Sequence, residues 1–225
     1  MNIRYIDQDS KQDIAYKFIN DKIASGEYPP GMVLVERQIA EDLAMSRTPV
    51  RAALQRLAAE NELVEAVPHL GVAVKTLTAV DAEEIFELRA VIETAAMRSF
   101  IAHYDAQAVN QLCAYVSDME RAFMEGDMDM TSILDVKFHQ FLLDHCNNRR
   151  LDKVFRILIP TSRRLRSILF AQKADWNFMS DTVKWHREYA NFILQKDVPA
   201  AQAHLERHYA AIVGELKKYL PQKQT

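Results

Sequence analysis

A carboxylate and several imidazoles in the second half of the chain have the types and spacing of a metal site. Asp135 and His139 are four residues apart, which places both on one face of a helix. His186 follows in a later helical segment, and His204 and His208, again four apart, fall in the last one. Imidazole and carboxylate together suit zinc, nickel, cobalt, iron or manganese without selecting among them. Spacing alone leaves one alternative open, in which these histidines only pack in a helical core.

The first half of the chain carries residues suited to another task, contact with the edges of DNA bases. The stretch 46–51, SRTPVR, combines a helix N-cap, a proline in the first helical turn and two arginines one turn apart. A helical segment at 36–44 precedes it across a short turn. Proteins enter the major groove with this helix-turn-helix order and with basic residues at the front of the second helix. An isolated arginine pair could equally lie on a solvated helix, but the preceding helix favours the groove.

The composition is that of a globular chain with a local basic patch. Of the 225 residues, 49% are hydrophobic and 26% charged, and the net charge is −3. No acidic residue occurs in the sequence from 43 to 59, which contains Arg47, Arg51 and Arg56. A mildly acidic protein can bind DNA through such a patch, because the local field decides.

The sequence contains no membrane span and no secretion signal that we recognise. No apolar run approaches the roughly 20 residues of a transmembrane helix, and the N-terminus lacks an apolar signal-peptide core. Cys113 and Cys146 do not suggest a disulfide framework. We therefore predict a cytoplasmic protein with no membrane partner.

Two sets of elements must position these groups. In the N-terminal part, residues 10–24 have helical apolar spacing that stops at Gly26. After the two helices around the short turn, 63–67 and 72–74 have the pattern of a β-hairpin, the wing. We predict a winged helix-turn-helix DNA-binding domain over 8–76.

The C-terminal part is one helical segment after another. Thr78 followed by Asp81 is a variant of the capping box and marks the start of the first segment. Six helices are expected, over 79–102, 105–125, 128–146, 149–174, 179–195 and 197–220. Their number and length predict an antiparallel bundle. The fold class is therefore mainly α, with a winged helix-turn-helix followed by a six-helix bundle at 79–220.

The N-terminal part resembles the winged-helix domain of the GntR family of bacterial transcriptional regulators. The resemblance is carried by residues 26–31, 34–37, 39–40, 43, 46–51, 53–54, 56–57 and 71–74. It implies a homodimer that binds a double-stranded operator through two copies of the helix starting at Ser46. The positions that it implies in DNA contact are Arg37, Ser46, Arg47, Thr48, Arg51 and, in the wing, Gly71.

The C-terminal part resembles the all-helical FCD domain of the FadR subfamily, and its six helices are closer to the VanR-like branch. The matching pieces are 87–93, 135–139, Asn148, His186 and His208. The resemblance implies a divalent metal, zinc or nickel first, and it prefers His208 to His204 as a ligand. The implied ligands are Asp135, His139, His186 and His208. It also implies that Arg89 pairs with the carboxylate of a small acid bound at the metal.

Together these patterns predict a transcriptional regulator whose operator affinity is controlled by a small carboxylate or sugar acid. Repression is the expected direction of control. An enzyme is not expected. Two other classes stay as alternatives: a metal-dependent hydrolase, because a metal with an open position can activate water, and an architectural DNA-binding dimer without an effector. A hydrolase would leave the winged helix without a role. The sequence also shows no well-placed extra carboxylate that could act as its general base. The architectural dimer requires an apolar bundle interior.

Overall fold

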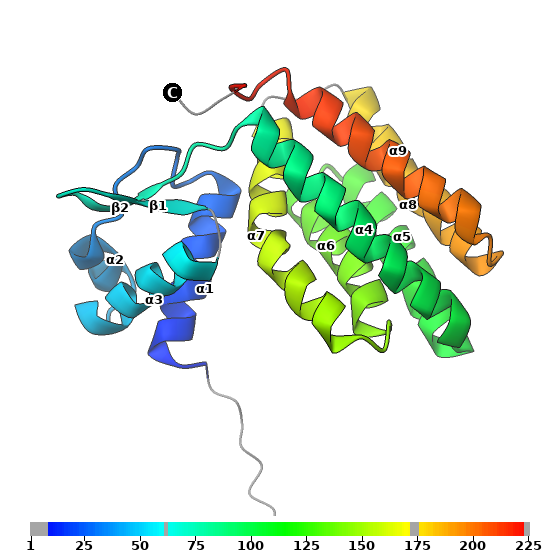
Figure 1. Cartoon of the computed structure of the whole chain (residues 1–225), viewed down its shortest axis with the longest axis horizontal. Helices are drawn as coiled ribbons and strands as arrows, with labels where there is room; N and C mark the ends of the chain where they lie inside the picture. The colour runs from blue at the N-terminus through cyan, green and yellow to red at the C-terminus, as the bar shows by residue number, and fades with distance from the viewer. Residues whose placement is uncertain (1–8, 61–62, 172–175, 223–225) are drawn as a thin grey trace, which may run out of the picture. The chain divides into compact units, whose positions relative to one another are not determined.

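The computed structural model describes residues 9–60, 63–171 and 176–222. It divides into two compact units, Met1–Leu77 and Thr78–Thr225, whose elements are labelled in Figure 1. Residue 8, the predicted start of the N-terminal domain, and residues 172–174, the predicted end of the fourth bundle helix, lie outside the described residues.

The N-terminal unit is a winged helix-turn-helix, as predicted. Its elements are α1 (Lys11–Ser25), α2 (Glu36–Asp42), α3 (Arg47–Glu60), β1 (Val64–Val67) and β2 (Gly71–Val74). Helix α3 packs on α1 and α2 because it carries a buried stripe of Val50, Leu54 and Leu57. The helical period places Arg47, Thr48 and Arg51 away from this stripe, and all three are exposed.

Turn chemistry sets the connections of this unit. Gly26 closes α1 in the left-handed conformation, with φ 89°. Strands β1 and β2 pair antiparallel from Val64↔Val74 to Val67↔Gly71, and Gly71 has φ +99°, which favours glycine. A bridge from Val33 to Ala73 adds a short pairing that the sequence pattern did not predict.

The C-terminal unit is the predicted bundle of six helices. They are α4 (Ala79–His103), α5 (Ala106–Met124), α6 (Met128–Asp144), α7 (Arg149–Ala171), α8 (Trp176–Leu194) and α9 (Val198–Leu216). Helix α4 contacts α6, α7, α8 and α9, while α5 packs on α6 and α8. Helix α8 begins at Trp176, before the expected residue 179. Helix ends are the part of a helix that a periodic sequence pattern determines least. Among the described residues, no helix combines the length and apolar character needed to cross a bilayer.

Side-chain caps start five of these helices, and at α7 the Asn148 Oδ1 accepts from the backbone amides of Arg150 and Leu151. Thr78 accepts a hydrogen bond from the Asp81 backbone amide, and the Asp81 carboxylate accepts one in return from the Thr78 amide, so the capping box is complete. Asp105, Asp127 and Asp197 accept from the third amide of α5, α6 and α9 at 2.8, 2.9 and 3.0 Å. Each cap satisfies an amide that the helix itself cannot pair.

Replacement of Thr78 by alanine should lower the free energy of unfolding of the bundle by about 1 kcal/mol, because the Asp81 amide loses its acceptor. Thr78→Ser keeps a hydroxyl and should stay close to wild type. Urea unfolding followed by circular dichroism measures both. Equal midpoints for the alanine and serine variants would contradict a stabilising role for the cap.

Candidate metal centre

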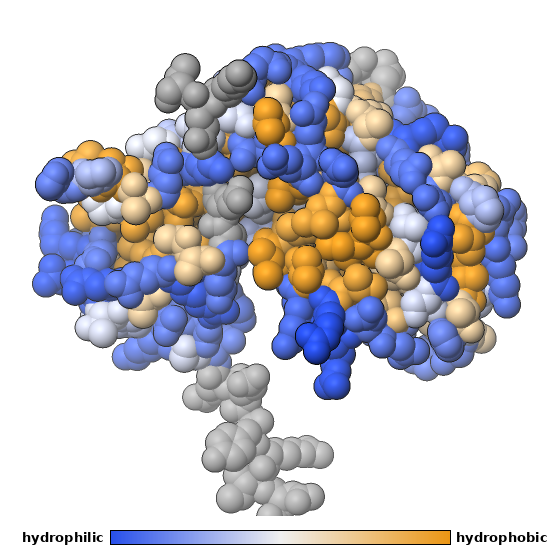
Figure 2. Space-filling model, in the orientation of Figure 1, coloured by the Kyte–Doolittle hydropathy of each residue, from blue (hydrophilic) through white to orange (hydrophobic). Residues whose placement is uncertain are grey.

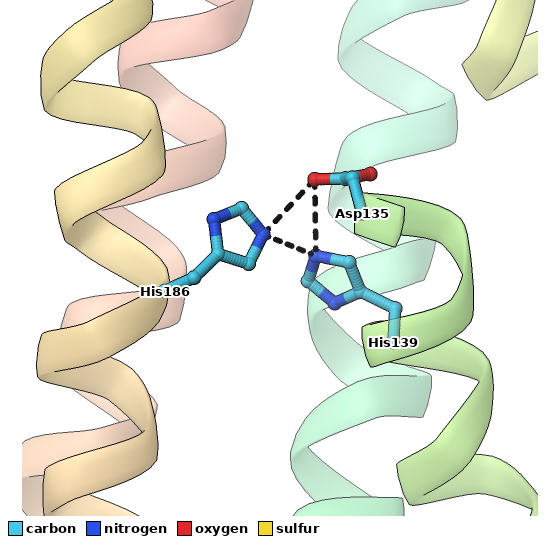
Figure 3. Close-up of side chains that lie close together, drawn as sticks. All are labelled: Asp135, His139 and His186. Atoms are coloured by element: carbon cyan, nitrogen blue, oxygen red, sulfur yellow. Dashed lines mark hydrogen bonds and ion pairs between the residues drawn. The ribbon is translucent and has the colours of Figure 1, made fainter. Parts of the chain in front are cut away.

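Three predicted metal ligands meet in the core of the bundle. Asp135 and His139 come from α6 and His186 from α8, and Figure 3 shows the three side chains pointing toward one another. His186 Nε2 lies 2.9 Å from Asp135 Oδ1, and His139 Nε2 lies 3.8 Å from the same oxygen. The two Nε2 atoms are 3.4 Å apart. All three side chains are buried, so one carboxylate oxygen and two imidazole nitrogens face a common point.

The two histidines of α9, His204 and His208, both stack on Trp185. His208 stacks on the indole at 3.8 Å between ring centroids, and its Nε2 is buried without a hydrogen-bond partner. It is not within the 4.8 Å group formed by Asp135, His139 and His186. His204 also stacks on the indole, at 5.0 Å between ring centroids, and its Nε2 lies 3.2 Å from the Trp185 carbonyl oxygen. His208 is therefore the α9 histidine with a nitrogen still available.

The outer ring nitrogens are held by partners that fix both tautomers. His139 Nδ1 lies 2.5 Å from Glu93 Oε2, and His186 Nδ1 lies 2.8 Å from the Thr182 carbonyl oxygen. Neither an ionised carboxylate nor a carbonyl can donate, so in both rings Nδ1 carries a proton and Nε2 points inward. Metal-binding histidines are oriented by outer partners of this kind.

Glu93 belongs to a buried network that sequence reasoning missed. Its Oε1 accepts from Arg89 Nε at 2.8 Å and from the Tyr209 hydroxyl at 2.6 Å. The Arg89 guanidinium also lies 5.1 Å from the Tyr209 ring centroid and 5.2 Å from that of Phe155. The sequence therefore contains an extra carboxylate after all. Because three donors occupy it, it positions His139 rather than serving as a free base.

Asp135 has a second cationic neighbour, Arg166 of α7. Its Nη1 donates to Asp135 Oδ2, opposite the oxygen that faces the histidines. Arg89, Asp135 and Arg166 line a cavity of about 10 Å³, together with Ser132, Val136, Phe155, Ile159, Ser162 and Arg163. That volume holds about one water molecule.

Burial and charge set the protonation of the centre. Burial alone would raise the pKa of Asp135, but the charge of Arg166 outweighs it and holds that pKa well below its usual value. Glu93 is likewise buried, yet Arg89 and His139 bring its pKa to about 2. Burial lowers the pKa of His186 and, more strongly, of His208. At neutral pH the centre therefore holds two carboxylates and neutral His186 and His208.

This donor set fits a divalent cation. The 2.9 Å approach of His186 Nε2 to Asp135 Oδ1 would be a hydrogen bond only with a doubly protonated ring. Burial disfavours that form of His186, and we therefore regard Oδ1 as lacking a donor, in agreement with its unpaired state. Two imidazoles and one carboxylate whose Nε2 and Oδ1 atoms converge are ligands of zinc, nickel and related metals. A bound cation would satisfy all three.

The predicted DNA-contacting residues lie in the N-terminal unit. Arg37 pairs with Glu41 at 2.9 Å. Arg51 donates from Nε and Nη2 to the two oxygens of Glu36, both at 2.8 Å, and this pairing lowers the pKa of Glu36. The other four positions are exposed: Ser46, Arg47 and Thr48 at the start of α3, and Gly71 at the start of β2. Sequence reasoning missed Glu36, whose acidic type does not point to DNA.

No local signal could have identified the other missed residues. Glu93 follows Arg89 by four positions on α4, which suggests a pair but not that it is buried. Arg166 is one of three arginines in the stretch 163–166, and only the rotation of α7 decides which of them reaches Asp135. These contacts join α4 and α7 to α6 and depend on how the helices pack.

Comparison with known proteins places the chain among regulators. The FCD domain matches residues 84–211, and the family of bacterial regulatory proteins named gntR matches residues 11–74. An uncharacterized HTH-type transcriptional regulator of Bacillus subtilis, YdhC, is 27% identical over 91% of this chain and 90% of its own length. The gluconate operon transcriptional repressor of the same organism is 26% identical over 82% of this chain and 75% of its own. The structure of E. coli McbR/YncC shares the fold, with a TM-score of 0.82, 19% identity and coverage of 94% and 99% of the two chains.

Replacement of His208 by glutamine should flatten the acid dependence of folding in metal-free protein. A histidine whose folded pKa is lowered stabilises the fold above the ordinary histidine pKa, and this stability is lost as the pH falls, because the unfolded chain takes up the proton. Each such group contributes a slope of up to about 1.4 kcal/mol per pH unit. Urea unfolding in chelator between about pH 7.5 and 5.5 measures the slope.

The matched control is His69→Gln, which removes an exposed histidine of the hairpin. It should keep the wild-type slope. If His208→Gln also keeps that slope, burial of a neutral His208 is wrong.

Proposed function

The chain belongs to the GntR family of bacterial regulatory proteins and carries its FCD domain, and from this premise we propose a metal-dependent repressor that responds to a small organic acid. The winged helix would bind a double-stranded operator, and the bundle would bind the acid at a divalent cation. One observation carries the sensing half: one ligand atom from each of Asp135, His139 and His186 lies within 4.8 Å of the others in a buried core. Such a regulator acts where the chromosome is, in the bacterial cytoplasm.

The DNA-binding half rests on the exposed front of α3. Arg47, Thr48 and Arg51 are exposed there, while the opposite side of the helix is buried. The bidentate contact with Glu36 holds the exposed Arg51 guanidinium at the surface. A guanidinium in that place can donate two parallel hydrogen bonds to a guanine. Arg37, Ser46 and Gly71 are proposed to position the unit on the phosphates.

The sensing half is proposed to use Asp135, His139, His186 and His208 as ligands of zinc or nickel. The unpaired, buried Nε2 of His208 supports its inclusion. A bound dication would supply a Lewis-acidic anchor for a carboxylate. Arg89 lines the neighbouring cavity, but its Nε is committed to Glu93, so only its remaining donors could meet the acid.

A sugar acid is the effector class that the relatives favour. Two Bacillus relatives are gluconate operon repressors, and a Paenarthrobacter relative is a probable repressor of a D-xylose utilization operon. These names also support repression as the direction of control. To act, the acid must bind one arrangement of the regulator more tightly than the other, since equal affinity would shift nothing.

A homodimer is proposed because the bundle exposes apolar side chains on two adjacent helices. Leu88 and Val91 on α4 and Val154 and Ile157 on α7 are exposed, and Figure 2 shows an apolar area over these helices. Exposed apolar patches of this kind often mark protein interfaces. Two copies joined there would match the two half-sites of an operator.

The alternative functions are weaker. Membership of a transcription-regulator family confirms that the chain is not an enzyme, which removes the hydrolase. An architectural dimer needs an apolar interior, whereas this bundle buries Arg89, Glu93, Asp135 and Arg166. Burial of so many charged groups is costly and is more often found where a site is functional.

Arg51→Ala should weaken binding to the operator by about 5- to 150-fold, because a bidentate base contact of about 1–3 kcal/mol is lost. A gel-shift titration with a duplex selected from a random pool measures it. Arg121→Ala removes the same charge from an exposed site on α5 and should leave the affinity unchanged. Equal affinity for wild type and Arg51→Ala would reject the groove assignment.

The double variant His139→Ala/His186→Ala should lose the metal, because two of the converging nitrogens are gone. Elemental analysis of protein purified with and without added zinc or nickel measures the metal per chain. The control, His69→Ala/His103→Ala, removes two exposed histidines and should keep the wild-type content. Stoichiometric metal in the double variant would show that the ligand set is wrong.

A further inference from the structure

The two oxygens of Asp135 face different partners. Oδ1 faces His186 at 2.9 Å and His139 at 3.8 Å. Oδ2 accepts from Arg166, whose side chain is itself buried. Arg166 is therefore the counter-ion of Asp135 in the cation-free protein and lies next to the point where the proposed ligands converge.

The two ion pairs at this centre balance in charge. Arg89 pairs with Glu93 and Arg166 with Asp135, so the two ion pairs are neutral together. A divalent cation at Asp135 would leave two uncompensated positive charges in a core of low dielectric, with Arg166 directly beside it. Uncompensated buried charge is strongly unfavourable. Either Arg166 must move away from the Asp135 carboxylate, or an anion must bind beside the cation and Arg166.

The cavity next to Asp135 is where such an anion could join. Arg89, Ser162 and Arg166 line it, and all three are buried. At about 10 Å³ it admits no ligand larger than a water molecule while Arg166 stays on Asp135. The Ser162 hydroxyl donates a hydrogen bond to the Leu158 carbonyl oxygen at 2.7 Å. The guanidinium groups are therefore the donors that remain for an anion.

We propose that Arg166 exchanges partners, binding Asp135 in the absence of a cation and the carboxylate of the effector in its presence. This rests on the proposed function and assigns the specificity for an anion to Arg166, with Arg89 in support. A guanidinium suits this role because it can bind a carboxylate through two parallel hydrogen bonds. Cation and carboxylate then bind cooperatively, and by reciprocity each raises the affinity for the other.

A simpler role for Arg166 makes the opposite prediction. If Arg166 only orients Asp135 for the metal, its removal should weaken cation binding. If Arg166 competes with the cation for Asp135, its removal should strengthen cation binding when no anion is present. The sign of the change separates the two.

The test measures the Ni²⁺ affinity of full-length wild type and Arg166→Gln by competition with a chromophoric chelator. Each protein is titrated in chloride buffer and again with saturating acetate as a minimal carboxylate. We expect acetate to tighten Ni²⁺ binding to wild type by about 5-fold or more. Arg166→Gln should bind Ni²⁺ several-fold more tightly than wild type without acetate, and acetate should have almost no effect on it.

Arg156→Gln is the matched control. Arg156 is on the same helix and also pairs with aspartates, Asp144 and Asp152, but it is exposed. This variant should behave as wild type in both buffers. Should Arg166→Gln not fold, Arg166→Lys replaces it: the ammonium keeps the competing charge, so Ni²⁺ binding without acetate stays near wild type, while loss of the bidentate contact reduces the acetate effect.

The outcomes separate this inference from the proposed function. Wild type that binds no Ni²⁺ overturns both. Wild type that binds Ni²⁺, with weaker binding in Arg166→Gln, leaves the metal centre standing and overturns the exchange. The same acetate effect in wild type and in the Arg166 variant also overturns it.

Discussion

The bundle depends on keeping two buried carboxylates paired with cationic or hydrogen-bonding groups. Asp135 and Glu93 are almost completely inaccessible, and an unpaired ionised carboxylate in such a place would be severely unfavourable. Arg166 from α7 satisfies one, while Arg89 from α4 and Tyr209 from α9 satisfy the other. The polar centre thus ties these helices to α6, and their apolar faces seal it from water. Any change of charge at the centre is therefore felt by most of the bundle.

This arrangement gives a physical route from ligand to conformation. A close-packed core does not deform continuously. When a buried group changes partners, its helix therefore either stays in place or shifts to a second discrete packing arrangement. Arg166 and Asp135 belong to different helices, α7 and α6, which pack on each other. A ligand that separates this pair acts directly on the α6–α7 contact. The exposed apolar side chains Val154 and Ile157 lie on the same helix as Arg166, so the proposed dimer surface and the proposed sensor share one helix.

The sequence predicted what depends on local rules and missed what depends on packing. Thr78 and Asp81 predict the start of α4, because a capping box is defined by only four consecutive residues. Asp135 and His139 share a face because the helical period alone requires it. The meeting of His186 with them needed the family resemblance, since nothing local relates α8 to α6. Glu93 and Arg166 were missed because the partner of a buried charge depends on helix rotation, which no spacing in one segment records.

The two units use the same chemical pair, arginine with carboxylate, in opposite environments. The Arg51 side chain is 57% exposed and that of Glu36 is 30% exposed. Water and salt therefore screen their attraction. Such a pair orients the guanidinium and releases it readily to a guanine or a phosphate. Arg166 and Asp135 are almost fully buried, and there water cannot replace a lost partner. The surface arginine can therefore change partners whenever DNA arrives, whereas the core arginine can leave its aspartate only if a cation takes its place and an anion receives it.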